Sequence, residues 1–372
     1  MAEWRDCKLG DLITFQRGND LPRAKMKAGK YPVVGSNGII GWHDEYTTDE
    51  PSITIGRSGN IGKPFLYMGK SWSHNTTLYV KEYKGVAPLF IYYFLQTLNL
   101  ANYAGGSAVP TLNRNHIHTL NVHIPKTIEE QEKIAGILMA FDNKIGINER
   151  INDNLEQQAQ SYFQELFVDN ANPEWTICTV SDLGTVVGGS TPSKAKPEYY
   201  TGSGIAWITP KDLSINKSKF ISHGENDITE LGLKNSSATI MPKGTVLFSS
   251  RAPIGYIAVA VDKVTTNQGF KSVVPKSEIG TAYVYFFLKH NLPIIEGMAS
   301  GSTFKEVSGS TMKNIPAVIP DVETLARFND FCIPVFAQQR ALEEQNQLLV
   351  TLRDNLLPRL MSGEIDVSAI QI

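Results

Sequence analysis

Two kinds of hydrophobic pattern alternate along the 372-residue chain. Short apolar runs punctuated by Gly, Pro, Asn and Ser fill residues 1–125 and 172–320, which is typical of β-strands joined by turns. Each of these lobes also predicts one helix, near residues 88–99 and 281–290. Residues 126–171 and 321–372 show the three- and four-residue spacing of helices instead. The predicted strands include SITI, KPFLYM and TTLYV in the first lobe, and ATIM, GTVLFS and YIAVAV in the second.

Each helical stretch predicts a long helix with a stripe at the 3-4 spacing. The first opens with a capping box, Thr127 and Glu130, and we expect a short helix to give way to a long one near residues 141–143. Pro334 marks the same junction in the second stretch. The stripes most simply pack together as an antiparallel coiled coil, and separate helices lying on the lobes are the alternative. The stripe residues are Ile145, Asn148, Asn152, Leu155, Ala159, Tyr162 and Leu166, and Leu342, Gln345, Leu349, Leu352 and Leu356.

The sequence also contains an internal repeat. Trp4, Cys7, Asp11 and Leu12 recur 171 positions later, and IYYFL (91–95) recurs as VYFFL (284–288) after a shift of 193. Such self-similarity indicates a tandem duplication with insertions in the second copy. We therefore predict an α+β protein of four parts: two pseudo-symmetric, mainly β domains at 1–125 and 172–320, a central helical region at 126–171, and a C-terminal helical region at 321–372.

Charge is distributed unevenly over these parts. The chain has a net charge of −2, yet residues 1–125 hold 13 Lys and Arg against 9 Asp and Glu, and residues 172–320 hold 14 against 11. The helical stretches are acidic, with 4 against 9 and 4 against 8. Because only local potential attracts a polyanion, the cationic lobes favour a nucleic-acid partner.

Several classes of protein are disfavoured. Three distant cysteines without a C-x-x-C pair argue against a disulfide framework and a zinc site, and the seven histidines show no metal-ligand spacing. His116 and His118 alternate in an apparent strand approach, and we interpret them as surface residues. There is no apolar run of about 20 residues and no secretory signal at the start. We expect a cytoplasmic protein without a membrane segment or a metal.

The stretch GRSGNIGKP (56–64) looks like a phosphate-binding loop but is not one. Gly56 lies six positions before Gly62, one more than the motif allows, and Pro64 stands where a Ser or Thr is needed. Its counterpart in the second lobe, SSRAPIGY, lacks the lysine but keeps an arginine and Ile-Gly. Both copies therefore predict a tight turn between two strands that presents a cation, with Gly supplying the backbone freedom.

The predicted geometry suits a divided DNA site. A helix over residues 142–167 spans about 39 Å at 1.5 Å per residue. One turn of DNA, about 34–36 Å, separates major grooves that face the same side. Two diverged lobes held at that spacing suit a bipartite sequence with unlike halves, in which the helices act as a ruler over base pairs that are not read.

These features together resemble the specificity (S) subunits of type I restriction–modification systems, over the whole chain. The resemblance is carried by the order of motifs that occur twice: WRDCKLGDLITFQRGN and WTICTVSDLGTVVGGSTPSK, RSGNIGK and RAPIGY, HNTT and TNQG, GGSAVPTLNRNHI and GSTFKEVSGSTM. IPKTIEEQEKIAGIL before the first long helix and LLPRLMSGEI at the end of the second complete the pattern.

The resemblance implies that each lobe is a target-recognition domain for one half of a split double-stranded DNA sequence. It also implies that the helices recruit two methyltransferase (M) subunits and, through them, the restriction (R) subunits. S-adenosylmethionine, ATP and Mg²⁺ are then bound by those partners, and no cofactor is expected in this chain. The sequence independently lacks [DNS]-P-P-[YFW] and a G-x-G after a strand, and Glu82-Tyr83-Lys84 has no suitably placed acidic partner. We therefore expect a subunit that is not an enzyme.

Candidate DNA contacts are cations, amides and hydroxyls in the turns of both lobes, because such groups bind phosphates and base edges. Arg57 and Arg251 are the leading ones. The alternative is a tandem binding or adaptor module for peptide or carbohydrate on a coiled coil, which does not explain the alternating charge. The first-lobe candidates are Arg17, Asn19, Arg23, Lys25, Arg57, Ser58, Asn60, Lys63, Asn75, Thr76, Arg114 and Asn115; those of the second are Ser193, Lys194, Lys196, Arg251, Tyr256, Asn267, Gln268 and Lys305.

Overall fold

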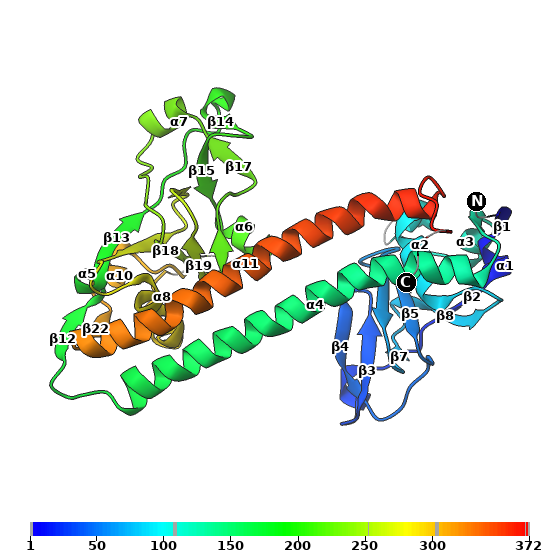
Figure 1. Ribbon diagram of the computed structural model, residues 1–372, viewed down its shortest axis with the longest axis horizontal. Helices are drawn as coiled ribbons and strands as arrows, with labels where there is room; N and C mark the ends of the chain where they lie inside the picture. Colours follow the sequence, from blue (N-terminus) through cyan, green and yellow to red (C-terminus); the bar gives the residue numbers. More distant parts are fainter. Residues whose placement is uncertain (1–2, 107–109, 252, 302–304, 369, 371–372) are drawn as a thin grey trace. The chain divides into compact units, whose positions relative to one another are not determined.

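The computed structural model describes residues 3–106, 110–251, 253–301, 305–368 and 370. Residues 107–109, 252 and 302–304, which belong to the predicted motifs GGSAVPTLNRNHI, RAPIGY and GSTFKEVSGSTM, lie outside the described residues. The described residues form two compact units, and each unit combines one lobe with parts of both long helices (Figure 1). The first unit comprises Met1–Gly146 and Gln347–Ile372, and the second comprises Ile147–Asn346.

The lobe of the first unit contains two main sheets. The larger has the strand order β2-β8-β5-β6, with every pair antiparallel, and the smaller has the order β4-β3-β7. Helix α2 (Pro88–Thr97) packs on the larger sheet, and its buried face carries Phe90, Ile91 and Phe94. The strands are β2 (Ile13–Arg17), β3 (Tyr31–Gly35), β4 (Gly38–His43), β5 (Ser52–Gly56), β6 (Pro64–Tyr67), β7 (Trp72–Ser73) and β8 (Thr77–Tyr83).

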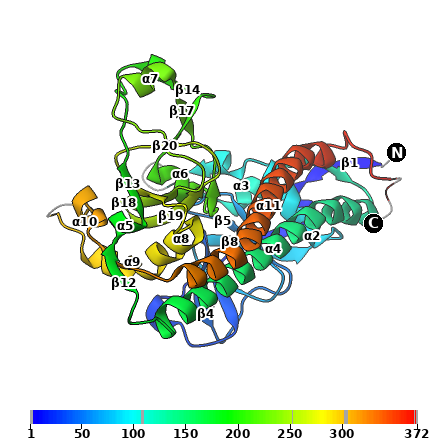
Figure 2. The ribbon, with the colours of Figure 1, turned by 60° about the vertical axis from the view of Figure 1, so that its left-hand side comes forward.

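The lobe of the second unit repeats this design. Its larger sheet has the order β13-β21-β18-β19-β16, so four strands follow the same sequence of neighbours as in the first unit. Figure 2 shows β14, β17 and α7 (Glu230–Lys234) at the end of this lobe that lies away from helix α11 (Val322–Met361). The strands are β13 (Gly184–Gly188), β14 (Tyr200–Thr201), β15 (Ile205–Ile208), β16 (Phe220–Ile221), β17 (Asn226–Ile228), β18 (Val246–Ser250), β19 (Ile254–Ala260), β20 (Thr265–Thr266) and β21 (Lys271–Pro275).

Smaller elements are repeated as well. A two-stranded ribbon, β1-β11 in the first unit and β12-β22 in the second, joins the beginning of each lobe to its end. Short strands β9 (Ala104–Gly105) and β10 (Thr111–Leu112) pair in the first unit. The other ribbon strands and helices are β1 (Trp4–Lys8), β11 (Asn121–Pro125), β12 (Thr176–Thr179), β22 (Pro316–Ile319), α1 (Leu9–Leu12), α3 (Arg114–His118), α5 (Val180–Leu183), α6 (Pro210–Ile215), α8 (Thr281–His290), α9 (Leu292–Gly297), α10 (Gly309–Lys313), η1 (Arg23–Lys25), η2 (Leu100–Tyr103) and η4 (Pro197–Tyr199).

The duplication, the strand pattern and the helix of each lobe are thus confirmed, with one strand wrong. The segment ATIM (238–241) is not a strand, although its composition favours one, and only Met241 makes an isolated bridge, to Val264. Pro242 follows at once, and a turn in which the Thr245 N–H donates to the Pro242 carbonyl leads the chain into β18. Met241 is buried whereas Ile240 is 43% exposed, so the apolar residues of this segment report the burial of one side chain rather than sheet pairing.

Each unit has a core to which the long helix of the other repeat contributes. In the first unit, Leu360, Met361 and Val367 join the buried side chains of the lobe. In the second unit, Ala159, Phe163 and Leu166 pack with Phe328 and Tyr283 in the same way. Each lobe therefore buries apolar surface of a helix that begins in the other repeat.

The two long helices are continuous, which corrects the predicted break. Helix α4 runs from Ile128 to Gln164 and continues as a π-helical turn, Glu165–Asp169, and α11 runs from Val322 to Met361. Pro334 lies inside α11 on its exposed side, and the missing N–H is tolerated because buried Cys332 and Val335 hold the helix on both sides. The first bond of the predicted capping box is confirmed, because the Glu130 N–H donates to the Thr127 hydroxyl over 3.3 Å. The Glu130 carboxylate accepts from the Thr127 hydroxyl over 3.1 Å.

The helices pack antiparallel within each unit. In the second unit the Asn148 amide donates to Gln345 Oε1 over 2.7 Å and the Asn152 amide donates to the Gln339 carbonyl over 3.3 Å, so partners on α11 descend as those on α4 ascend. The alternative of unpaired helices is excluded. Along α11 one stripe of side chains that are at least half-buried has spacings of four and three: Val335, Gln339, Leu342, Asn346, Leu349, Arg353, Leu356 and Leu360.

Leu352 departs from the predicted stripe. Its side chain is 41% exposed, and the neighbouring Arg353 reaches across to Asp142 of α4 instead. Gln345 is also exposed but retains its contact to Asn148. On α4, Ala159 and Leu166 of the stripe are buried, whereas Ile145, Leu155 and Tyr162 are half-buried. The apolar spacing predicted Leu352 at the contact between the helices. Arg353 takes that position instead, because its charge is paired with Asp142.

Candidate nucleic-acid interface

Several predicted DNA contacts of the first lobe converge at one end of its larger sheet. Strands β2 and β5 end there, and β8 and β6 begin there, because Arg17 pairs with Leu78, Gly56 with Thr77 and Ile55 with Pro64. The connecting turns therefore emerge side by side. We call this set of turns edge 1, and its residues are 17–20, 57–63, 74–76 and 111–113.

The backbone of Arg57 is fixed on both sides within edge 1. Its N–H donates to the Thr76 carbonyl over 2.8 Å, and its carbonyl accepts from the Leu112 N–H over 2.8 Å. Its side chain is half-buried, and no carboxylate among the described residues forms an ion pair with its guanidinium. Ser58 is half-buried beside it, and Asn60 and Lys63 are exposed further along the turn.

The same turn explains the glycines of GRSGNIGKP. The Gly62 N–H donates to the Gly56 carbonyl and the Gly56 N–H to the Lys63 carbonyl, so both amides are used inside the turn. Gly59 and Gly62 have positive φ angles of 78° and 73°. A Cβ on Gly56 would lie 1.8 Å from the Asn60 carbonyl oxygen. The turn between β5 and β6 is confirmed, and these glycines serve its close backbone packing rather than a phosphate.

Other candidates at edge 1 are tied to their neighbours. The Asn75 amide donates to Asp20 Oδ1 over 2.6 Å, and the Asn19 N–H donates to the Ser73 carbonyl. The Thr76 hydroxyl accepts from the Ser36 N–H over 3.2 Å. Asn19, Asn75 and Thr76 therefore help to shape the edge, and Arg17 is exposed at the end of β2.

Arg23 and Lys25 are not brought to edge 1. They form η1, and the following Lys27 donates its N–H to His43 Nδ1, at the end of β4 opposite to the β3–β4 turn. Both side chains are exposed. The basic loop after β2 thus reaches a different part of the lobe from Arg57.

Arg114 and Asn115 begin α3, where the Asn113 side chain accepts from the Asn115 N–H over 3.0 Å. The Arg114 guanidinium approaches the Phe15 carbonyl of β2 at 3.4 Å. His118, predicted to be a surface residue near a strand, is instead helical and half-buried, and its Nε2 accepts from the Phe15 N–H over 2.9 Å. Burial lowers the pKa of His118, which favours the neutral ring that this bond requires.

The second lobe has an equivalent edge, called edge 2, at residues 188–191, 250–251, 253–254, 267–271 and 305–307. The Ser250 N–H donates to the Gly269 carbonyl over 2.7 Å, and the Ser250 carbonyl accepts from the Val307 N–H over 2.9 Å. The Ser250 backbone thus makes the two hydrogen bonds that the Arg57 backbone makes in edge 1, and the arginine of edge 2 lies one residue later. Arg251 follows directly and is half-buried.

Charge pairing distinguishes Arg251 from Arg57. Arg251 Nη1 lies 3.6 Å from Glu306 Oε2, and Glu306 Oε1 lies 3.4 Å from Lys271 Nζ. Lys271 and Glu306 were not among the sequence candidates, because their proximity depends on the Arg251–Glu306 bridge. Lys305, next to Glu306, is exposed.

The remaining candidates of the second lobe have different environments. Asn267 Oδ1 accepts from the Gly269 N–H over 2.8 Å and thereby shapes its own turn, and the exposed Gln268 accepts from the Thr191 hydroxyl. Tyr256 lies in β19 and packs on a hydrophobic cluster, so its ring serves the fold. Ser193, Lys194 and Lys196 are exposed before η4, and Lys196 lies 3.8 Å from Glu198.

Polar clusters attach the lobes to the long helices, and the sequence did not single them out. In the first unit, Asp142 of α4 accepts from the Tyr93 hydroxyl of α2 at 2.5 Å and lies 2.5 Å from Arg353 of α11. We call these three residues lock 1. An acid in a helix that is otherwise acidic gives no sequence signal of such a contact.

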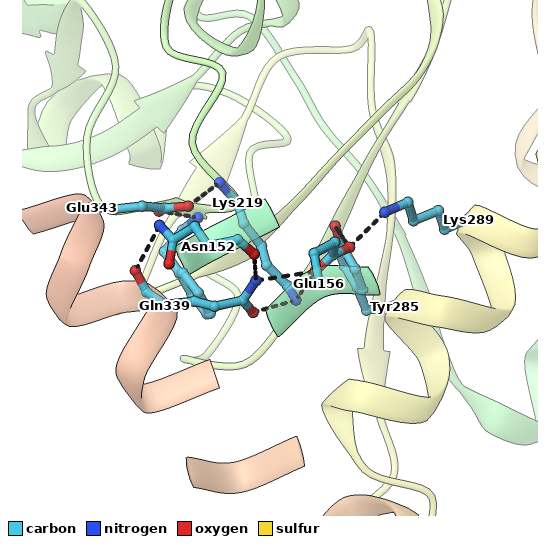
Figure 3. Close-up of polar contacts among 8 residues, drawn as sticks. Asn152, Glu156, Lys219, Tyr285, Lys289, Gln339 and Glu343 are labelled. Atoms are coloured by element: carbon cyan, nitrogen blue, oxygen red, sulfur yellow. Dashed lines mark hydrogen bonds and ion pairs between the residues drawn. The ribbon is translucent and has the colours of Figure 1, made fainter. Parts of the chain in front are cut away.

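Lock 2 is the larger cluster of the second unit, shown in Figure 3. Glu156 of α4 lies 2.8 Å from Lys219 Nζ and 2.5 Å from Lys289 Nζ, and it accepts from the Tyr285 hydroxyl over 3.1 Å. Gln339 of α11 accepts from Lys219 over 3.0 Å and donates to Glu156 over 3.3 Å. These five residues define lock 2.

The electrostatics of lock 2 favour its ionised form. Burial by itself would raise the pKa of Glu156, but the two ammonium groups outweigh it and hold that pKa at about 2. Burial lowers the pKa of Lys219 to about 8, against the attraction of Glu156. The Lys219 ammonium also lies 3.6 Å from the centroid of the Phe336 ring and 4.3 Å from that of Tyr285. Such contacts stabilise a cation that has lost water.

Other kinds of site are not found in the described part of the chain. No three His, Cys, Asp or Glu side chains there gather as metal ligands. Among the described helices, none combines the length and hydrophobicity that a membrane crossing requires.

Comparison with known proteins decides the family. The family model described as the type I restriction modification DNA specificity domain matches residues 1–157 and again 172–348. The chain belongs to this family. Its two matches coincide with the two repeats, so each lobe with the start of its long helix is one copy of the specificity domain.

Individual relatives agree with this assignment. The MjaIX specificity subunit of Methanocaldococcus jannaschii is 42% identical over 166 residues, which cover 44% of this chain and 38% of that protein. The HindI specificity subunit of Haemophilus influenzae is 24% identical over 331 residues, covering 69% of this chain and 71% of that protein. The crystal structure of the S subunit from M. genitalium shares the fold, with a TM-score of 0.66, 17% identity and 96% of each chain covered.

Proposed function

We propose that this chain is the sequence-specific DNA-binding subunit of a type I restriction–modification complex, in which each lobe reads one half of a bipartite double-stranded site. The observation that carries the proposal is the double match to a DNA specificity domain. Edges 1 and 2 support it, because each places an arginine after the equivalent strand, β5 or β18. Cations on turns reach phosphates and guanine edges.

The proposal assigns the long helices two roles. They set the length of the unread spacer, and they recruit two M subunits, through which the R subunits join. Catalysis, with S-adenosylmethionine, ATP and Mg²⁺, then belongs to those partners. This chain acts in the cytoplasm and selects the DNA sequence to which they are brought. A related pair of apolar grooves, one in each unit, supports recruitment of two copies of one partner.

The grooves lie at equivalent places. In the first unit a groove of about 560 Å³ lies between the start of α2 and one face of α4, and in the second a groove of about 680 Å³ lies between the start of α8 and one face of α11. Their helix faces correspond residue by residue after a shift of 197 positions. Ala135, Gly136, Met139 and Ala140 line the first, and Cys332, Ile333, Phe336 and Ala337 line the second.

Salt dependence of DNA binding tests this function against an adaptor for peptide or carbohydrate. Binding of the full chain to a random duplex is expected to weaken by tenfold or more between about 50 and 200 mM salt, because each neutralised phosphate releases counterions. Fluorescence anisotropy titrations measure this slope. Affinity that does not change with salt, or no duplex binding, would contradict the proposal, and co-purification with a methyltransferase subunit is the independent check.

A further inference from the structure

The two locks occupy equivalent positions in the duplicated structure. Asp142 and Gln339 are 197 positions apart, and so are Glu156 and Arg353. The same shift relates the helix faces of the two grooves, which confirms the correspondence. Asp142 and Gln339 each lie on the helix that follows their own lobe, whereas Arg353 and Glu156 each come from the helix of the other repeat.

The incoming residue has opposite charge in the two locks. The first repeat, through Asp142 on α4, receives the cation Arg353, and the second repeat, through Lys219 and Lys289 of its lobe, receives the anion Glu156. The incoming side chains are 25% and 19% exposed, so water screens these charges only in part. Charge at a partly buried helix contact selects between partners. Two like charges there raise the free energy of pairing by more than two opposite charges lower it.

The consequence appears when two copies of one repeat are paired with each other. In a pair of first repeats, Glu156 of one copy would come to lie beside Asp142 on α4 of the other, and two carboxylates would meet. In a pair of second repeats, Arg353 would enter beside Lys219 and Lys289, and three cations would meet. The pairing of unlike repeats brings opposite charges together in both locks.

We propose that locks 1 and 2 form a charge code that makes each repeat accept only the long helix of the other repeat, so that like repeats of two copies of this chain do not pair. The code resides in Asp142 and Arg353 on one side and in Glu156, Lys219 and Lys289 on the other. It is independent of what the edges bind.

A reversal of lock 1 tests the code in the full chain. The double variant Asp142→Arg/Arg353→Asp keeps an ion pair in lock 1 and leaves lock 2 untouched. It also brings opposite charges together when like repeats of two copies pair. The introduced cation at position 142 then meets Glu156, and the introduced anion at position 353 meets Lys219 and Lys289.

Sedimentation equilibrium measures the effect of this reversal. The variant is expected to form dimers with a dissociation constant about tenfold below that of the wild type, which corresponds to about 1.4 kcal/mol. The matched control, Arg340→Glu/Glu344→Arg, reverses an exposed pair on α11 and should leave self-association unchanged.

A second variant tests the charge code even if the reversal variant does not fold. Glu156→Arg/Arg353→Glu exchanges the two incoming residues, so that repulsion arises in both locks within one chain and attraction arises between like repeats of two chains. This variant is expected to lose monomer stability and to form dimers. The charge code is overturned if the reversal variant is folded and self-associates no more than the wild type, or if the exchange variant stays a monomer of wild-type stability.

Discussion

At the scale of single residues, the two edge arginines differ in what holds them. The Arg251 guanidinium lies beside Glu306, which also binds Lys271, so this side chain must leave an ion pair before it contacts DNA. Arg57 meets no such carboxylate among the described residues, and its backbone is fixed by two hydrogen bonds. A cation that is positioned but unpaired is the better donor to a phosphate or a guanine edge.

Arg57→Ala is therefore expected to weaken binding to a cognate duplex by about 1–3 kcal/mol, and Arg251→Ala by less, because release of Glu306 offsets part of the loss. Anisotropy titrations of cognate and random duplexes separate the two possible roles: a phosphate contact weakens both alike, whereas a base contact weakens the cognate one. Lys81→Ala is the matched control, since Lys81 is exposed toward the end of β8 that lies away from edge 1. Binding by Arg57→Ala as tight as that of Lys81→Ala and of the wild type would show that Arg57 does not contact DNA.

Sequence reasoning locates some of these residues and misses others for a physical reason. Arg57 and Arg251 are found because a turn between two strands has local signals, in its glycines and in its repetition. The pairing of Glu306 with Lys271 and the packing of Tyr256 on a core are missed, because these environments depend on strand pairing over long separations. The environment of His118 is missed for the same reason, since its partner is 103 positions away.

At the scale of elements, the sequence predicts the long helices well but not their attachment. Apolar spacing reveals α4 and α11 because that spacing is local, and their antiparallel direction follows from the lobe that separates them along the chain. Asp142, Glu156 and Arg353 lie at the contact but resemble solvent-facing charges in the sequence, since their partners come from other elements. The predicted break at residues 141–143 is wrong for a related reason: Asp142 is held by Tyr93 and Arg353, and the helix continues through it.

Glu156 makes the attachment of α4 to the second lobe sensitive to acid. Its folded pKa of about 2 lies below its ordinary value of 4.5, so its stabilising effect is complete above about pH 4.5 and is lost as the pH falls toward 2. Glu156→Gln leaves Lys219 buried without its anion and is expected to cost about 3 kcal/mol at pH 7. The difference between wild type and variant should shrink below pH 4.5.

Urea unfolding at pH 7, 4.5 and 3 measures this difference. Glu344→Gln is the matched control, because Glu344 forms an exposed pair with Arg340 on the same helix pair and should change stability by less than about 1 kcal/mol. A difference between Glu156→Gln and wild type that stays constant from pH 7 to pH 3 would contradict the assigned role of this carboxylate.

At the scale of the whole molecule, each repeat has one site for its proposed DNA contacts, the edge, and another for attachment to the long helices. The two larger sheets share four strands in the same order, and both edges lie beyond their ends, whereas each lobe attaches to the helices through its core and its lock. The polar and cationic side chains of the edges are thus distinct from the residues of the two locks. On the proposed function, lobes of different specificity are therefore expected to be interchangeable if the attachment residues are kept.

Replacement of residues 1–125 by the equivalent lobe of a relative is therefore expected to change one half of the recognised sequence. The other half and the spacer should stay the same, because the second lobe, α4 and α11 are unchanged. The donor lobe must offer a tyrosine hydroxyl to Asp142 where Tyr93 now does, since loss of that bond would weaken lock 1. Mapping of methylated adenines in cells that carry the complete system reads out both halves. If both halves changed, the two lobes would not read independently, because a single exchanged lobe would then have altered bases that the retained lobe contacts.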